Sequence, residues 1–293
     1  MKIRLFFIPI IFCFTIAALE MPVTASEGEQ NATKPSKFSS LVDRLVKQGF
    51  DRERLEKIYS DEKVYFDPKG VSLFFVHSES SLDYDQFVTD KSVAKAKDYM
   101  QQHKAKLDRA EEKYGVDKTI ITAILLVETR LGTYLGNRGV LNTLSTMAAL
   151  TEEDLKEELW ESTSASRRLT RKAFEKKAGV KAEWAFKELK ALLKYSERES
   201  LDAVELTGSY AGAMGISQFM PSNALKLAVD GNDDGRINLF QHADAVASIA
   251  NYLKHHGWKP SISRKQAHKV LYRYNHSNYY VDTLLKISDR LKG

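Results

Sequence analysis

The chain has 293 residues, 43% hydrophobic and 28% charged, which allows one large globular domain or two modest ones and excludes wholesale disorder. The formal net charge of +5 suits an anionic partner such as a cell-wall polymer, although an ordinary solvated surface explains it equally well. No run of clustered Lys and Arg with interleaved aromatics indicates a nucleic-acid partner, and the single cysteine, Cys13, excludes a disulfide within the chain.

Residues 1–25 are predicted to be a secretory signal peptide. Lys2 and Arg4 precede an apolar run that ends near Leu19, and small residues stand before a cleavage point near Ala25. A signal anchor is the alternative, but the run is short for a spanning helix. Polar residues 26–37 are expected to be a flexible linker before one folded domain over 38–293. We therefore expect an exported protein of the periplasm or cell envelope.

Helical spacing of apolar residues dominates the folded part. It predicts helices within 38–50, after a cap at Asp51, over 91–114 and 117–131, twice within 151–200, from Pro221 onward, and within 243–258, 264–275 and 279–291. Residues 64–77 contain Pro68 and Gly70 and are expected to be extended. Because alternating stretches are few, the predicted fold class is mainly α with a small minor β element.

Glu128 stands out in the apolar segment "ITAILLVETRLG". Asp117 is placed to cap this helix and Gly132 to end it, while Ile121, Ile124, Leu125 and Glu128 fall on one stripe that is expected to face the core. Burial would raise the pKa of a carboxyl group and keep its proton near neutral pH, as a general acid requires. An ion pair with Arg130, or exposure at the helix end, is the structural alternative.

The segments "AILLVETRLGTYLGNRGVLNTLSTMA" and "GSYAGAMGISQFMPSNALKLAVDGNDDGRINLFQHADAVASIANYLKHHGW" resemble the lytic murein transglycosylases of glycoside hydrolase family 103, the membrane-bound lytic transglycosylase B family. Weaker likeness continues in "YRYNHSNYYV" and "LVKQGFDRERLEKIYSD", so the resemblance covers nearly all of 38–293. It implies a lysozyme-like fold and cleavage of the β-1,4 bond between N-acetylmuramic acid and N-acetylglucosamine without water. The product would be a 1,6-anhydro end, with Glu128 as the single acid and then base.

The same resemblance implies contacts to the glycan strand of peptidoglycan. The substrate-binding residues that it assigns are Ser209, Gln218, Tyr252, Tyr274, Asn275 and Tyr280. Core packing is the alternative for each tyrosine, and turn geometry explains the glycines Gly212 and Gly215. Leu131 stands where the family commonly has Trp. This difference is expected to change contacts to sugars away from the cleaved bond more than the reaction at Glu128.

A loop typical of calcium binding follows in "DGNDDGRINLFQ". Asp230, Asn232 and Asp234 take the first, third and fifth positions of an EF-hand-like loop, and Arg236 supplies a backbone carbonyl at the seventh. The twelfth residue is Gln241 instead of Glu, and the resemblance implies Asp244 as the closing ligand. The all-oxygen set predicts a structural Ca²⁺, with no cofactor for catalysis. A hydrogen-bonded turn without metal is the alternative.

Three other functions remain open from the sequence. A hydrolytic muramidase would use the same Glu128 with water in place of the muramic acid C6 hydroxyl. A catalytically silent peptidoglycan-binding protein would bind the glycan strand in its cleft without cleaving it. A structural calcium-binding export protein would have no saccharide affinity. We expect a monomer, with association at the membrane surface or the cell wall.

Overall fold

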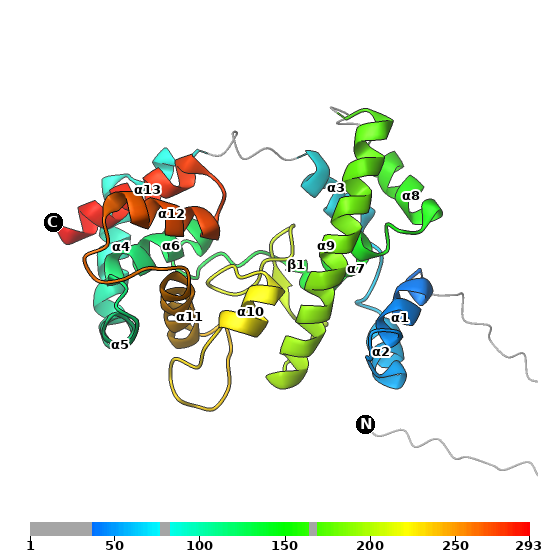
Figure 1. Ribbon diagram of the computed structural model, residues 1–293, viewed down its shortest axis with the longest axis horizontal. Coiled ribbons are helices and arrows are strands. Elements are labelled where there is room, and N and C mark those ends of the chain that lie inside the picture. The colour runs from blue at the N-terminus through cyan, green and yellow to red at the C-terminus, as the bar shows by residue number, and fades with distance from the viewer. Residues whose placement is uncertain (1–36, 77–82, 164–168) are drawn as a thin grey trace, which may run out of the picture. The chain divides into compact units, whose positions relative to one another are not determined.

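The computed structural model describes residues 37–76, 83–163 and 169–293. The expected signal peptide and all of the expected linker except Lys37 lie outside these ranges. The described residues form thirteen α-helices, a short 3-10 helix and one two-stranded antiparallel sheet (Figure 1). The mainly α prediction with a minor β element is therefore confirmed.

In the first half, each range predicted to be helical contains a helix, and the helices at 68–76 and 140–148 were not predicted. The helices of this half are α1 Ser39–Val46, α2 Arg52–Tyr59, α3 Pro68–Val76, α4 Asp90–Gln102, α5 Lys104–Tyr114, α6 Lys118–Thr129 and α7 Val140–Ala148, with the 3-10 helix η2 at Asp85–Phe87. Asp51 caps α2 as predicted, because its side chain accepts a hydrogen bond from the Arg54 amide at 2.8 Å. The single helix expected over 91–114 is two helices that meet at His103.

The second half contains the longest helix and the sheet. Its elements are α8 Glu153–Thr163, α9 Arg171–Arg198, α10 Pro221–Leu227, α11 His242–His255, α12 Arg264–Tyr274 and α13 Asn278–Lys292, with strands β1 Arg138–Gly139 and β2 Thr207–Gly208. Arg138 pairs with Gly208 and Gly139 with Thr207. In the described ranges, no helix is both long and apolar enough to cross a membrane.

The extended structure expected over 64–77 is wrong for its second part, where α3 begins at Pro68. Proline is compatible with the first turn of a helix, where its missing N–H has no intrahelical partner. Asp67 caps this turn by accepting the Gly70 amide at 2.8 Å. Val71 and Phe75, one turn apart, are both buried. Their packing therefore stabilises a helix that Pro68 and Gly70 disfavour.

Helix α6 lies in the core of the part of the fold that carries Glu128. Ile120, Ile121, Ala123, Ile124 and Leu125 are all almost fully buried, and α6 packs against α13, α4, α5 and α11 (Figure 1). Helix α9 packs against α7 and α10. The end of α6 is consequently held by neighbours on several sides.

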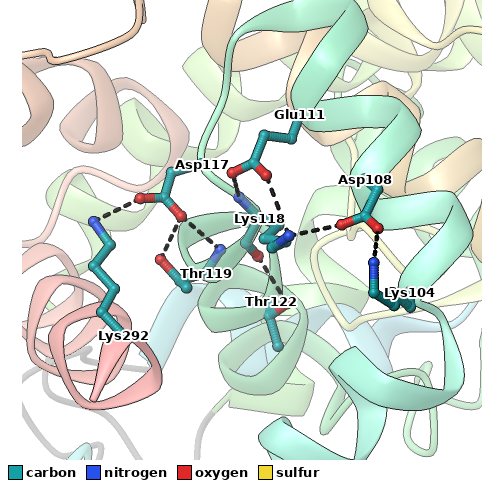
Figure 2. Close-up of polar contacts among 8 residues, drawn as sticks. All are labelled: Lys104, Asp108, Glu111, Asp117, Lys118, Thr119, Thr122 and Lys292. Atoms are coloured by element: carbon teal, nitrogen blue, oxygen red, sulfur yellow. Dashed lines mark hydrogen bonds and ion pairs between the residues drawn. The ribbon is translucent and has the colours of Figure 1, made fainter.

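Charged residues fix the other end of α6 (Figure 2). Asp117 accepts the amide of Thr119 at 2.9 Å and pairs with Lys292 of α13 at 2.6 Å. Burial opposes ionisation of Asp117, but the bonds from Lys292 and Thr119 outweigh it and hold the pKa of that carboxyl below its ordinary value. Lys118 pairs with Asp108 of α5 at 2.7 Å. This network joins α5, α6 and α13. At 1.5 Å per residue, Lys118 lies about 15 Å along the helix from Glu128.

Candidate active site

Glu128 lies in the last turn of α6, where the apolar stripe reaches the edge of the core. Ile121, Ile124 and Leu125 are fully buried as predicted, whereas Glu128 itself is half-buried. The hydroxyl of Tyr280 donates a hydrogen bond to Glu128 Oε1 at 2.6 Å. A half-buried carboxylate with a neutral donor on one oxygen suits proton transfer to a ligand at the protein surface.

Tyr280 comes from the first turn of α13 and is only 1% exposed. Ser277 caps this helix and accepts the Tyr280 amide at 3.3 Å, while the ring meets Tyr84 edge-on with centroids 6.4 Å apart. Burial and then the nearby charge of Glu128 raise the pKa of Tyr280 well above its ordinary value. Tyr280 therefore keeps its proton and acts as a donor to Glu128.

The backbone directly after Glu128 adopts an unusual conformation. Arg130, Leu131 and Gly132 have φ values of 49°, 64° and 86°, so the left-handed turn begins two residues before the glycine that was predicted to end the helix. Each non-glycine residue in this region costs of order 1 kcal/mol or more, and the surrounding contacts must compensate for it. Two buried hydrogen bonds of Thr129 supply part of that compensation.

Thr129 is fully buried and joins α6 to the glycine-rich loop at 208–219. Its hydroxyl donates to the Ile216 carbonyl at 3.0 Å and accepts the Gly132 amide at 3.0 Å. The segments approach closely here, since a Cβ on Gly132 would lie 2.8 Å from the His242 ring and 3.4 Å from the Ile216 side chain. Thr129 thus fixes the direction in which α6 presents the preceding Glu128.

Tyr274 and Tyr252 form the aromatic wall beside this loop. The Tyr274 hydroxyl donates to the Ser217 carbonyl at 2.6 Å, and the Tyr252 hydroxyl donates to the Arg273 carbonyl at 2.7 Å. Their rings meet edge-on at 5.0 Å, and both pack on Phe219. Tyr252 is 4% exposed and Tyr280 1%, so neither ring offers a face that could stack on a sugar. Tyr274 is half-buried and lies close enough to Glu128 for that charge to raise the pKa of Tyr274 further.

The remaining expected substrate residues are half-buried and lie in loops. The Ser209 hydroxyl accepts the amides of Ala211 and Ala213 at 3.3 and 3.2 Å, which shapes the turn. The Gln218 amide group donates to the carbonyls of Gly215 at 2.9 Å and Leu135 at 3.2 Å. Asn275 directly follows Tyr274 at the end of α12. Among the predicted residues, Tyr280 and Tyr274 are those that the structure brings to Glu128.

The expected calcium loop is closed by its own side chains. Asp230 accepts the amides of Asn232, Asp233 and Gly235, which holds the pKa of Asp230 below its ordinary value although burial opposes this. The Asn232 amide nitrogen donates to Asp234 Oδ2 at 2.8 Å and to Gln241 Oε1 at 3.3 Å. Oxygen atoms from the fifth and twelfth positions therefore already converge on one point.

Asp244 is fully buried behind this loop, and its two oxygens accept the amides of Gly231 and Asn238 at 2.9 and 2.6 Å. Burial and then repulsion from Asp230 and Asp234 raise the pKa of Asp244. The described ranges contain no ready-made group of three His, Cys, Asp or Glu around a metal position. The donor set fits Ca²⁺ by its chemistry, and binding would require Asn232 to present its oxygen in place of its nitrogen.

A cavity of about 670 Å³ lies on the opposite side of α6 from Glu128. Leu126 lines it, and this residue is about 160° around the helix from Glu128. Its floor contains Tyr99, His103 and His242, whose rings are in mutual contact. This cavity is therefore separate from the face that presents the carboxylate.

Comparison with known proteins defines the family. The model of the Transglycosylase SLT domain family matches residues 33–265, and the chain belongs to this family. The chain is 32% identical over 248 residues to membrane-bound lytic murein transglycosylase B of Escherichia coli strain K12. The matched region covers 79% of this chain and 60% of that relative. The chain thus spans 60% of the length of the curated relative that it matches.

Solved structures agree with this assignment. Soluble lytic transglycosylase SltB1 of Pseudomonas aeruginosa has a TM-score of 0.70 at 24% identity, covering 86% of this chain and 97% of that one. The Escherichia coli lytic transglycosylase Slt35 in complex with calcium has a TM-score of 0.69 at 25% identity, covering 87% and 92%. The predicted mainly α, lysozyme-like fold is confirmed.

Sequence reasoning missed Thr129 and Tyr84 as parts of the site. Thr129 adjoins Glu128, and a threonine at the end of an otherwise apolar helix is a signal that its hydroxyl has a partner outside the helix. Tyr84 lies just before η2 and has no such signal, because only the tertiary fold brings it to Tyr280.

Proposed function

We propose that this protein is a lytic transglycosylase of peptidoglycan and that Glu128 is its catalytic acid and base. The hydrogen bond from Tyr280 to Glu128 Oε1, at 2.6 Å, is the observation that supports this role most directly. It places a protonated, buried donor on the one carboxylate at the end of α6, in a chain of the transglycosylase family.

The proposed reaction needs one carboxylate in two successive roles. Protonated Glu128 gives its proton to the oxygen of the β-1,4 bond as the bond from muramic acid C1 breaks. The ionised Glu128 then takes the proton of the C6 hydroxyl while that oxygen bonds to C1, which gives a 1,6-anhydro end without water. An ordinary hydrolysis commonly uses a second carboxylate, and a second is unnecessary here. Tyr280 steadies the charged form between the two steps.

Substrate contacts are proposed for four of the six residues that the resemblance assigns, namely Ser209, Gln218, Tyr274 and Asn275. Ser209 and Gln218 are half-buried, and their internal hydrogen bonds shape the loop backbone that would face the hydroxyl and acetamido groups of a sugar. Tyr274 and Asn275 end α12 beside the loop and are half-buried, so part of each remains for a ligand. Tyr280 is proposed to support Glu128 through its hydroxyl group. Tyr252 is proposed to support Tyr274 through the edge-on contact of their rings.

The partner and location follow from this substrate. We propose peptidoglycan glycan strands as the partner and the cell envelope, after export, as the location, in keeping with the name of the Escherichia coli relative. The loop at 230–244 is proposed to bind a structural Ca²⁺ through Asp230, Asn232, Asp234, Arg236 and Asp244. Such an ion would offset the repulsion among its three aspartates.

Release of soluble sugars from purified peptidoglycan tests the activity. Glu128→Gln is expected to lower kcat by about 10² to 10⁴, the range of general acid–base catalysis, because the amide cannot exchange the proton. Glu112→Gln, at an exposed site on α5, is the matched control and is expected to act like the wild type. Equal activity of Glu128→Gln and the control would contradict the proposal.

A further inference from the structure

A cluster of half-buried aromatic rings lies where α3 meets α9. The rings of Phe74 and Trp184 are stacked with centroids 5.7 Å apart and an interplanar angle of 10°, and Tyr210 lies 6.3 Å from Phe74. All three side chains retain partial exposure. Together with Lys177 and Lys181 of α9, we name them the Phe74–Trp184 patch.

Two lysines one helical turn apart give this patch a positive charge. Lys181 Nζ lies 4.5 Å from the Phe74 ring centre and 5.1 Å from that of Trp184, both within cation–π range. Lys177 Nζ donates to the Phe75 carbonyl at 2.9 Å and so closes the carboxyl end of α3. Burial lowers the pKa of each lysine, and Lys181 lowers that of Lys177 further.

No carboxylate neutralises this charge within the described residues, because neither Lys177 nor Lys181 takes part in any of their ion pairs. The two arginines of α9 are paired, Arg171 with Glu157 and Glu175, and Arg198 with Glu199. Two partly desolvated ammonium groups beside apolar rings would gain most from a ligand that carries carboxylates and small apolar groups.

The patch is connected to the catalytic face by one short loop. Tyr210 follows Ser209 in the loop at 208–219, and the other end of this loop receives Thr129 at Ile216 and Tyr274 at Ser217. Gly208 pairs with Arg138 of β1, and Met214 bridges to Phe219, so the loop backbone is held along its length. A polymer bound at Glu128 and along this loop would therefore be directed to the patch.

We propose that the Phe74–Trp184 patch binds the acidic peptide stem carried by the muramic acid units of the substrate. The inference rests on the proposed function for the identity of the strand. Stem carboxylates would pair with Lys181, and alanine methyl groups would pack against Phe74, Trp184 and Tyr210. Lys177 is assigned a structural part, because the carbonyl end of α3 already engages it.

Equilibrium binding of two uncleavable fragments tests the site. The probes are the N-acetylglucosaminyl-N-acetylmuramic acid disaccharide with its peptide and the same disaccharide without it. Titration calorimetry compares the wild type with Lys181→Met, Lys181→Arg and the matched control Lys176→Met, an exposed lysine of the same helix. Circular dichroism of each variant verifies that α9 remains folded.

The wild type is expected to bind the peptide-bearing fragment more tightly, with an advantage that shrinks as salt rises. Lys181→Met is expected to lose about fivefold in affinity for that fragment alone, the scale of a partly exposed charge pair. Lys181→Arg retains the affinity, and Lys176→Met is unchanged.

An equal loss for both fragments, no loss for Lys181→Met, or no measurable binding of the peptide-bearing fragment would overturn the proposal. The binding measurement does not depend on cleavage, because neither probe is cleaved. A wild type that fails to cleave glycan strands would therefore overturn the proposed function and not the binding site.

Discussion

At the scale of single residues, Tyr280 is the most informative neighbour of Glu128. Tyr280→Phe removes the donor to Glu128 Oε1 while keeping the buried ring. We expect kcat to fall about tenfold with little change in KM, because loss of a hydrogen bond to a charged group costs about 1.5 kcal/mol or somewhat more. Steady-state kinetics on purified peptidoglycan measure this, with Tyr279→Phe at an exposed site as the control. An unchanged kcat for Tyr280→Phe would show that the hydrogen bond from Tyr280 to Glu128 does not assist catalysis.

Thr129 is expected to act through position alone. Thr129→Val keeps the shape but loses both hydroxyl bonds, and it leaves the Ile216 carbonyl and Gly132 amide without that partner. We expect a loss of about 1 to 3 kcal/mol in the free energy of unfolding, together with a lower kcat. Thr129→Ser should largely restore both the free energy of unfolding and kcat. Urea denaturation measures the first and steady-state kinetics the second. A stable, inactive Thr129→Val would contradict a purely positioning role.

Residue-level prediction worked best where local pattern decides. Asp117 caps α6 as the sequence predicts, and the apolar stripe identifies Glu128 as unusual. The sequence did not indicate that Tyr252 and Tyr280 would be buried, because an aromatic residue suits a core and a sugar-binding face equally. Leu131 in a left-handed conformation was also beyond prediction, since no local rule favours a branched residue there.

At the scale of elements, the loop between α10 and α11 carries the calcium prediction. A free Ca²⁺ concentration about ten times the dissociation constant should add about 1.4 kcal/mol to the free energy of unfolding. Mg²⁺ should add less, because it requires a tighter octahedral site. Thermal unfolding with each ion measures this, using Asp234→Asn as the defective loop and the exposed Asp282→Asn as control. No shift of the wild-type transition with Ca²⁺ would contradict the metal site.

The contact among α4, α5 and α11 predicts an acid-sensitive element. Burial, His242 and Lys106 lower the pKa of His103 to about 4, and burial and Lys106 also lower that of His242. The unfolded chain binds these protons first, near its ordinary pKa of about 6.5. The free energy of unfolding should therefore fall as the pH drops from about 6.5 toward about 4.

Urea midpoints at several pH values in this window test that prediction. His103→Gln should flatten the dependence, and the control His276→Gln, at an exposed site, should leave the slope as it is. An unchanged slope in His103→Gln would show that other groups cause the acid sensitivity.

Element prediction from the sequence failed where tertiary contacts override local signals. Pro68 and Gly70 predict an interruption of regular structure, but the Asp67 cap and the buried Val71 and Phe75 stabilise α3. In 151–200 the periodicity was sufficient, and both predicted helices are present as α8 and α9.

At the scale of the whole molecule, the buried core of the described residues extends from Phe38 to Leu291. The family and the mainly α class were accessible from ordered motifs and helical spacing. The pairing of Glu128 with Tyr280 was not accessible, because these residues are 152 positions apart and only the packing of α13 on α6 joins them.

Digestion of purified peptidoglycan in heavy-oxygen water, followed by mass spectrometry of the released sugars, distinguishes transglycosylation at Glu128 from hydrolysis. We expect 1,6-anhydromuramic acid ends without heavy oxygen, and we expect these ends to be absent with Glu128→Gln. Reducing ends labelled with heavy oxygen would instead identify a hydrolytic muramidase that uses the same carboxylate. Release of no sugar by the folded wild type, with calcium present, would contradict the enzyme assignment and leave a peptidoglycan-binding protein.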